Sequence, residues 1–134
     1  MIFWKQWQQK KQQKKLQREQ VMAVHDRVVD HLLKLIQNGN LEIEDDYELR
    51  FDLMVFFASY LLFCQKDDVE FSQCFWELVF EGIQESLRLR GVTDIRMGAR
   101  MGEALNDATG RRNVYIAAWE ADDNDSLRRA IARN

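Results

Sequence analysis

The chain has 134 residues, of which 46% are hydrophobic and 31% are charged, and its net charge is −3. These values are typical of a soluble globular protein with one domain and a single core. Proline is absent. Because strand-and-turn proteins use proline in their turns, its absence argues against that class and favours helices joined by short connections. We therefore predict an all-α bundle of about five helices.

The charge is unevenly distributed along the chain. Residues 1–18 carry a charge of +6 and no acidic residue, whereas residues 19–134 carry −9. The apolar start of this stretch is too short for a secretory signal, and the stretch is richer in Lys and Gln than a mitochondrial presequence. We predict a basic arm over 1–18 that contacts a membrane or a ribosome, followed by a helical domain over 19–134. The arm residues expected to make this contact are Phe3, Trp4, Trp7, Lys10, Lys11, Lys14 and Lys15.

The first two predicted helices flank an acidic connection over 41–49. Apolar residues at helical spacing predict a helix over 16–37, which Asn38 and Gly39 would end. The second helix covers 50–64 and is buried on most sides. Its uncharged run, 53–64, is too short to span a bilayer. The stripe expected to face the core in the first helix consists of Val21, Val24, Val28, Leu32 and Leu35.

The third predicted helix follows a capping box formed by Asp67 and Glu70, and Gly91 would end it in a left-handed conformation. It has two apolar faces, which predicts a central position. Gly82 and Ser86 would let a neighbouring helix approach closely. The apolar faces consist of Phe71, Phe75 and Leu78 on one side and of Trp76, Phe80, Ile83 and Leu87 on the other.

A fourth helix is predicted from an N-cap at Thr93 or Asp94 to about residue 108. Gly98 and Gly102 remove two Cβ atoms from one strip of its surface. This strip would serve either a tight helix crossing or a binding groove, and both alternatives remain open. Gly110 would end the helix, and a last helix with a short helical coda would follow. The last helix would turn Val114, Tyr115, Ala118 and Trp119 towards the core.

No catalytic or metal-binding pattern is evident in the chain. Cys64 and Cys74 fit no zinc or redox spacing and are expected to be small buried hydrophobic residues. His25 and His31 are six residues apart and cannot hold one metal from one helix face. An Arg-rich zone over 88–112 could bind phosphate, but the interleaved acids argue against broad nucleic-acid binding. The residues alone indicate a helical binding or assembly protein.

Four short motifs occur in a fixed order over residues 50–120. An Arg-Phe-acid triplet (Arg50, Phe51, Asp52) opens the apolar helix. The second motif is an aromatic helix that ends in Leu-Arg before a glycine turn. The third is a Gly-x-Arg sequence, and the fourth is a Gly-Arg pair followed by a tyrosine. The chain here resembles the ubiquinol–cytochrome c chaperone family of cytochrome bc1 assembly factors. The later motifs are matched by Phe75, Phe80, Leu87, Arg88, Gly91, Val92, Asp94, Gly98, Arg100, Gly110, Arg111 and Tyr115.

The resemblance implies a chaperone without enzymatic activity that binds newly made cytochrome b or another membrane-protein client. It also implies a small partner assembly factor, a ribosome contact, and no cofactor of its own. The expected location is peripheral, on the cytoplasmic face of a bacterial inner membrane or the matrix side of the mitochondrial one. Two alternatives stay open: an accessory subunit of a respiratory or ribosomal assembly, and an RNA-binding adaptor that uses the arm. The client or partner candidates are Arg50, Phe51, Asp52, Arg88, Gly91, Asp94, Gly98, Arg100, Gly110, Arg111 and Tyr115.

Overall fold

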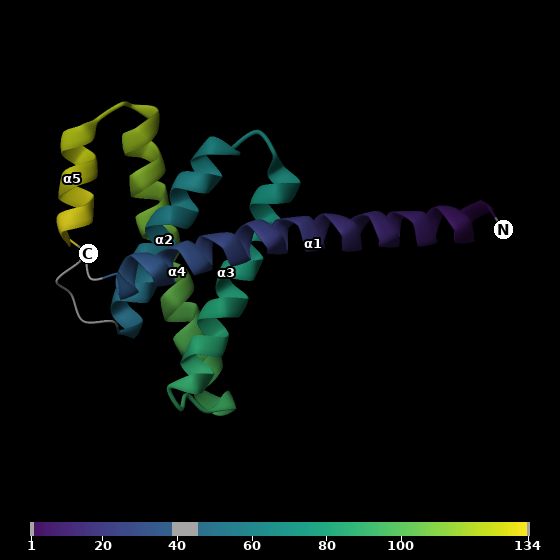
Figure 1. Cartoon of the computed structure of the whole chain (residues 1–134), viewed down its shortest axis with the longest axis horizontal. Coiled ribbons are helices and arrows are strands. Elements are labelled where there is room, and N and C mark those ends of the chain that lie inside the picture. The colour runs from purple at the N-terminus through teal and green to yellow at the C-terminus, as the bar shows by residue number, and fades with distance from the viewer. Residues whose placement is uncertain (1, 39–45, 134) are drawn as a thin grey trace.

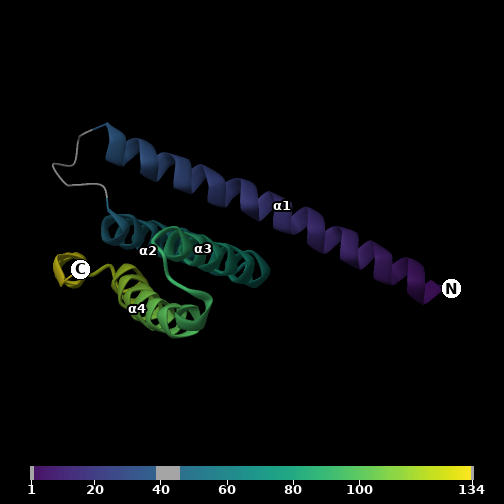
Figure 2. The same cartoon turned by 90° about the horizontal axis from the view of Figure 1, so that it is seen from below.

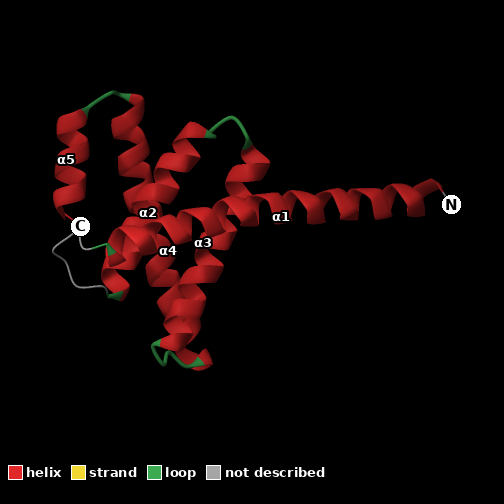
Figure 3. Cartoon of the chain, viewed as in Figure 1, coloured by secondary structure: helices red, strands yellow, loops and turns green. Residues whose placement is uncertain are grey.

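The computed structural model describes residues 2–38 and 46–133, which form five α-helices and contain no strand (Figures 1 and 3). The predicted all-α bundle of five helices is therefore confirmed. The helices are α1 (Ile2–Gln37), α2 (Tyr47–Cys64), α3 (Val69–Leu89), α4 (Asp94–Glu120) and α5 (Asn124–Arg133).

The helices form three layers, with α2 and α3 between α1 and α4 (Figure 2). In the core, Val55 and Ala58 of α2 and Phe75 of α3 are fully buried, and Tyr115 reaches them from α4. Val21 is buried from the opposite layer, α1. Both predicted apolar faces of α3 are used, because it contacts α1, α2 and α4. The predicted stripe of α1 also faces the core, with some members buried and the others half-buried.

The boundaries of α3 follow from its caps. Asp68 accepts a hydrogen bond from the backbone N–H of Phe71 at 3.0 Å. The cap is thus one residue later than the predicted Asp67. At the other end Gly91 has a φ of 90°, as predicted, and the N–H of Val92 donates to the carbonyl of Leu87 at 3.0 Å. These are the features of a Schellman motif, in which a glycine relieves the steric cost of left-handed backbone.

The prediction that Gly110 ends a helix is wrong, because α4 runs without interruption from Asp94 to Glu120. An interior glycine costs about 1 kcal/mol relative to alanine. Contacts on both sides of Gly110 offset this cost. Ala108 and Tyr115 are buried in the core, and Arg111 binds Asp107 one turn earlier.

Helix α1 begins at Ile2, 14 residues before the predicted start at residue 16. Lys and Gln, which fill much of this segment, are good helix formers. Residues 2–16 are exposed, and α1 reaches the bundle at Gln17 and Arg18, which bind Glu70 and Glu81 of α3. The first half of α1 thus projects beyond the other helices (Figures 1 and 2). The division of the chain at residue 18 into an arm and a domain remains a prediction.

Two sequence-based expectations about small side chains need correction. Cys64 is exposed at the end of α2, and Cys74 is half-buried, so the prediction that both are buried is wrong for Cys64 and holds only in part for Cys74. A Cβ atom at Gly82 would lie 3.9 Å from the His25 ring of α1, which is an ordinary contact. Helix α1 therefore approaches α3 there through a side chain, and no backbone contact explains the glycine.

The two thiols are expected to react at different rates. Burial raises the pKa of the Cys74 thiol, and Arg18 only partly opposes this effect. Because the thiolate is the reacting species, we expect iodoacetamide to modify Cys74 at least about tenfold more slowly than Cys64 at neutral pH. Peptide mass spectrometry over time measures both rates. In denaturant the two rates should converge, and faster modification of Cys74 in the native protein would contradict this placement.

The turn between α4 and α5 allows a stabilising substitution. Asp122 has a φ of 51°, and the N–H of Asp123 donates to the carbonyl of Ala118 at 2.9 Å, so an aspartate occupies a position that favours glycine. Asp122→Gly should raise the free energy of unfolding by about 0.5–1 kcal/mol, measured by urea titration. Asp122→Ala is the matched control, since it removes the same charge and keeps the Cβ. An equal increase in the free energy of unfolding in both variants would show that the lost charge causes the effect, and would contradict the backbone explanation.

Candidate functional site

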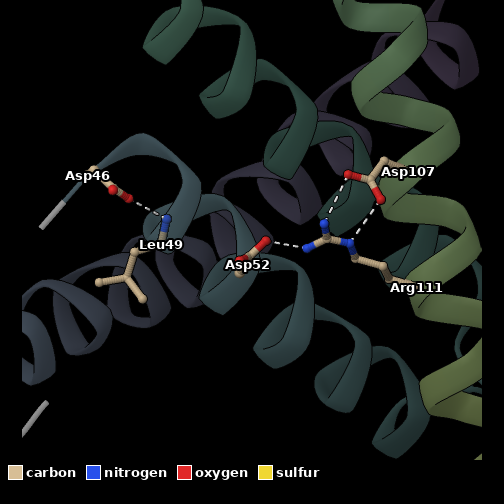
Figure 4. Close-up of polar contacts among 5 residues, drawn as sticks. All are labelled: Asp46, Leu49, Asp52, Asp107 and Arg111. Carbon is tan, nitrogen blue, oxygen red and sulfur yellow. Dashed lines mark hydrogen bonds and ion pairs between the residues drawn. The ribbon is translucent and has the colours of Figure 1, made fainter. Parts of the chain in front are cut away.

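Arg111 joins α4 to the first half of α2 (Figure 4). Its Nε and Nη2 atoms bind both carboxylate oxygens of Asp107 at 2.9 and 3.1 Å, and its Nη1 atom binds Asp52 across the interface. The guanidinium also lies over the ring of Phe51, 5.4 Å from its centroid. Only 17% of the Arg111 side chain is exposed. We call Arg111, Asp52 and Asp107 the arginine clamp.

The clamp keeps Arg111 charged and in a fixed orientation. Burial disfavours the charge, but the hydrogen bonds and negative charges of Asp52 and Asp107 outweigh burial and raise the pKa of Arg111 above its ordinary value. A bidentate pair fixes the plane of the guanidinium as well as its position. Three of the five N–H donors of Arg111 are bound by two carboxylates that neutralise its charge, so the arrangement suits a structural ion pair better than a phosphate site.

The clamp forms one wall of a groove of about 440 Å³ between the start of α2, the end of α3 and α4. On the other walls, Arg90 pairs with Glu48 at 3.4 Å, and Arg100 pairs with Glu103 at 3.5 Å. Arg90 also lies 4.6 Å from the centroid of the Tyr47 ring. Burial raises the pKa of Tyr47, and the charge of Arg90 partly opposes this shift. The groove lining is Tyr47, Glu48, Phe51, Asp52, Leu87, Arg90, Val92, Arg100, Glu103, Ala104, Asp107 and Arg111.

Four carboxylates and three guanidinium groups line this groove, so its charge is nearly balanced. We call it the polar groove. Such a lining offers hydrogen-bonding partners of both kinds and little net attraction for a polyanion. Its geometry therefore suits a polar protein segment better than a nucleic acid.

The structure brings four of the predicted site residues together in the polar groove, namely Phe51, Asp52, Arg100 and Arg111. The others lie elsewhere. Arg50 is exposed in the first turn of α2, Gly91 and Asp94 lie at the α3–α4 turn, and Gly110 lies within α4. Arg88 pairs with Glu85 of its own helix at 3.9 Å. Tyr115 is buried against Phe56 and Trp119, with ring centroids 5.3 and 6.0 Å away.

The sequence did not identify the other eight lining residues as site residues; the five with polar or charged side chains are Tyr47, Glu48, Arg90, Glu103 and Asp107. Asp107 and Arg111 are four residues apart on one helix, a spacing that indicates an ion pair. The ion pair between Asp107 and Arg111 could therefore have been predicted from the sequence. The pairing of Glu48 with Arg90 joins residues 42 positions apart and has no local signal.

A second feature of α4 is an open strip on its surface. A Cβ atom at Gly98 or Gly102 would meet no heavy atom of another described part of the chain within 4 Å. Ile95 is 96% exposed and Leu105 is 45% exposed on the same side of the helix. Of the two alternatives left open for this strip, the tight helix crossing is wrong within the described residues, because α4 turns Met97, Ala108 and Tyr115 to the core instead. We call Ile95, Gly98, Gly102 and Leu105 the glycine strip.

A larger open hollow of about 740 Å³ lies between α4 and α5, and no predicted site residue lines it. Its lining combines four alanines and Val114 with the polar or charged residues Asp123, Ser126, Arg129 and Arg133. None of the helices in residues 2–38 and 46–133 is long and apolar enough to cross a membrane. Within the same ranges, no group of His, Cys, Asp and Glu side chains is arranged to hold a metal ion.

Substitution of Arg111 tests the clamp. Arg111→Ala leaves two carboxylates close together without their cation, so we expect a loss of about 2–3 kcal/mol in the free energy of unfolding. Asp107 is half-exposed, and Asp107→Asn should cost less than about 1 kcal/mol. Urea titration monitored by far-UV dichroism measures both losses. Equal, small losses would show that the clamp contributes little to stability.

Comparison with known proteins supplies the family. The sequence model of the family described as ubiquinol-cytochrome C chaperone matches residues 40–134, so α2 to α5 lie within the match and α1 precedes it. No curated protein matches the chain. No solved structure matches it either. The matched range includes the arginine clamp, the polar groove and the glycine strip, and it covers well over half of the chain. This protein belongs to the ubiquinol-cytochrome C chaperone family.

Proposed function

We propose that this protein is a chaperone that holds newly made cytochrome b during assembly of the cytochrome bc1 complex. The family match over residues 40–134 is the observation that carries the proposal. Membership supports a chaperone role in the assembly of this complex. The choice of cytochrome b as the client follows from the resemblance and from the kind of surface that the helices expose.

The glycine strip is the surface that we assign to the client. Apolar helices from membrane proteins pack closely against small residues spaced four apart, because the missing side chains let two backbones approach. Gly98 and Gly102 have this spacing, and the exposed Ile95 and Leu105 extend the apolar surface at both ends. A single apolar helix of cytochrome b could lie along this strip before it joins its own bundle.

The polar groove is the surface that we assign to a small partner assembly factor. It is assembled from three helices, and its carboxylates and guanidinium groups can exchange intrachain pairs for pairs with a polar partner. The arginine clamp holds α2 against α4 at one wall of the groove. In this assignment the clamp has a positioning role, because it fixes the helix that carries the glycine strip.

Affinity purification with and without translation arrest distinguishes a chaperone from a permanent subunit. A chaperone should recover cytochrome b while synthesis continues and lose it after synthesis stops. Recovery of the mature complex at unchanged stoichiometry after arrest would contradict the proposal and favour an accessory subunit. Recovery of ribosomal RNA without cytochrome b would contradict it as well.

Leucine substitutions in the glycine strip test the client surface. Because the space around Gly98 and Gly102 is open, Gly98→Leu and Gly102→Leu should keep the fold and raise helix stability by about 0.5–1 kcal/mol. Both should reduce recovery of cytochrome b, since the new side chain keeps the client backbone at a distance.

Gly110→Leu is the matched control for these variants. Gly110 lies in the same helix, is equally open, and lies outside the glycine strip. It should gain similar helix stability and keep normal client recovery. Equal client recovery in all three variants would show that the strip does not bind the client.

A further inference from the structure

The exposed first half of α1 carries its apolar side chains at its tip. Ile2 and Phe3 are mostly exposed, and Trp4 and Trp7 are 62% and 52% exposed. Trp4 and Trp7 stack on each other with ring centroids 5.2 Å apart, and the ammonium of Lys11 lies 5.0 Å from the centroid of the Trp7 ring. Residues 2–16 lie outside the family match and far from both the polar groove and the glycine strip in sequence.

The charged and aromatic side chains of this segment are segregated both around the helix axis and along it. Around the helix axis, at 100° per residue, the three aromatic residues and four of the five lysines occupy less than half of the circumference. The glutamines at positions 6, 8, 9, 12 and 13 occupy the other side. Along the axis, the aromatic residues lie within the first two turns, and the four lysines follow in the next two turns. The segment therefore has an aromatic tip followed by a basic collar, consisting of Lys10, Lys11, Lys14 and Lys15.

The position of the bundle prevents the segment from lying flat on a surface with its lysine side. Lys10 and Lys14 continue the three-and-four spacing of Val21, Val24 and Val28, which face the bundle. Just beyond the collar, Gln17 donates a hydrogen bond to Glu70 of α3 at 3.0 Å. The lysine side of the segment therefore faces the side on which α2 and α3 lie (Figure 2). A flat surface placed along the lysine side would meet α3, and the opposite side offers mainly uncharged glutamines.

We propose that the first half of α1 enters the surface of an anionic lipid bilayer tip first. Ile2, Phe3, Trp4 and Trp7 then lie in the membrane interface, where aromatic side chains are favoured. The basic collar lies one to two turns higher and meets the anionic headgroups. Gln17, where contact with the bundle begins, is about 15 Å along the axis from Trp7, so the bundle stays outside the membrane. This inference goes beyond the proposed function and does not depend on the client.

The tip distinguishes a bilayer from the other polyanions that lysines attract. RNA would be bound by the collar alone and would leave Ile2 and Phe3 exposed to water. Bases stack on accessible aromatic faces, and the contact between Trp4 and Trp7 already occupies one face of each ring, so fewer faces remain for bases. An aromatic cluster at the exposed end of a cationic helix instead suits a lipid bilayer, which has an apolar interior and anionic headgroups at its surface.

Vesicle flotation of the full chain tests lipid binding. Wild type should float with vesicles of phosphatidylcholine and phosphatidylglycerol, and much less with phosphatidylcholine alone. Trp4→Ala with Trp7→Ala should lower the partition coefficient by about tenfold or more, because two large apolar side chains are lost. Lys10→Gln with Lys14→Gln should lower it by a similar factor, and only on anionic vesicles. Gln9→Ala with Gln13→Ala is the matched control and should bind like wild type.

A second pair of variants tests the tip-first orientation. Ile2 lies at the tip, and Leu16 is an exposed apolar residue at the other end of the segment, on the glutamine side. Ile2→Gln should weaken vesicle binding, whereas Leu16→Gln should leave it unchanged. Thermal unfolding should be the same for all these variants, since residues 2–16 are exposed.

Three outcomes would overturn the proposal. The first is equal flotation of wild type and the double tryptophan variant. The second is a loss in Leu16→Gln as large as in Ile2→Gln, which would indicate a helix that lies flat. The third combines two results: structured RNA releases the protein completely from anionic vesicles, and this RNA binds wild type and the double tryptophan variant equally. Together they would identify nucleic acid as the ligand of the first half of α1.

Discussion

The packing of α2 against α4 is the contact on which the other features of the bundle depend. Phe56 of α2 meets Tyr115 and Trp119 of α4, with ring centroids 5.3 and 5.7 Å apart. Nearer the start of α2, the arginine clamp joins the same two helices through Arg111 and Asp52. One end of the contact is therefore aromatic, and the other is an ion pair that is largely withdrawn from water. A buried cation without its carboxylates is costly, so the clamp favours one alignment of the two helices.

This contact explains why α4 is long and why one side of it is open. Buried residues before and after Gly110 hold both parts of α4 to the bundle, and the helix continues across a residue that would otherwise weaken it. Since Met97, Ala108 and Tyr115 face inward, the glycine strip faces away from the other helices. The polar groove forms where the start of α2 and the end of α3 meet α4. Both surfaces that we assign to binding thus follow from how α4 is held.

Local patterns in the sequence were sufficient to predict the helices. They were insufficient to predict which surfaces of each helix the other helices cover. The helical class, the two apolar faces of α3 and the left-handed Gly91 depend on spacing and on a few neighbouring residues, and all three are confirmed. The continuation of α4 past Gly110 and the exposure of Gly98 depend on where other helices lie. A glycine at four-residue spacing has the same local pattern in a tight crossing and on an open surface. The polar groove was missed for the same reason, because Glu48 and Arg90 meet only through the fold.

A site-specific photocrosslinker tests most directly whether the open side of α4 holds a client during its synthesis. The photoreactive residue would replace Leu105 in the glycine strip or, as a control, Asn113, which is also exposed on α4. Cells would be irradiated during a short pulse of labelled amino acids and again after translation arrest. The account predicts a crosslink from position 105 to newly made cytochrome b that disappears after arrest, with none from position 113. Equal crosslinks from both positions, or a crosslink from position 105 that persists in the mature complex, would contradict it.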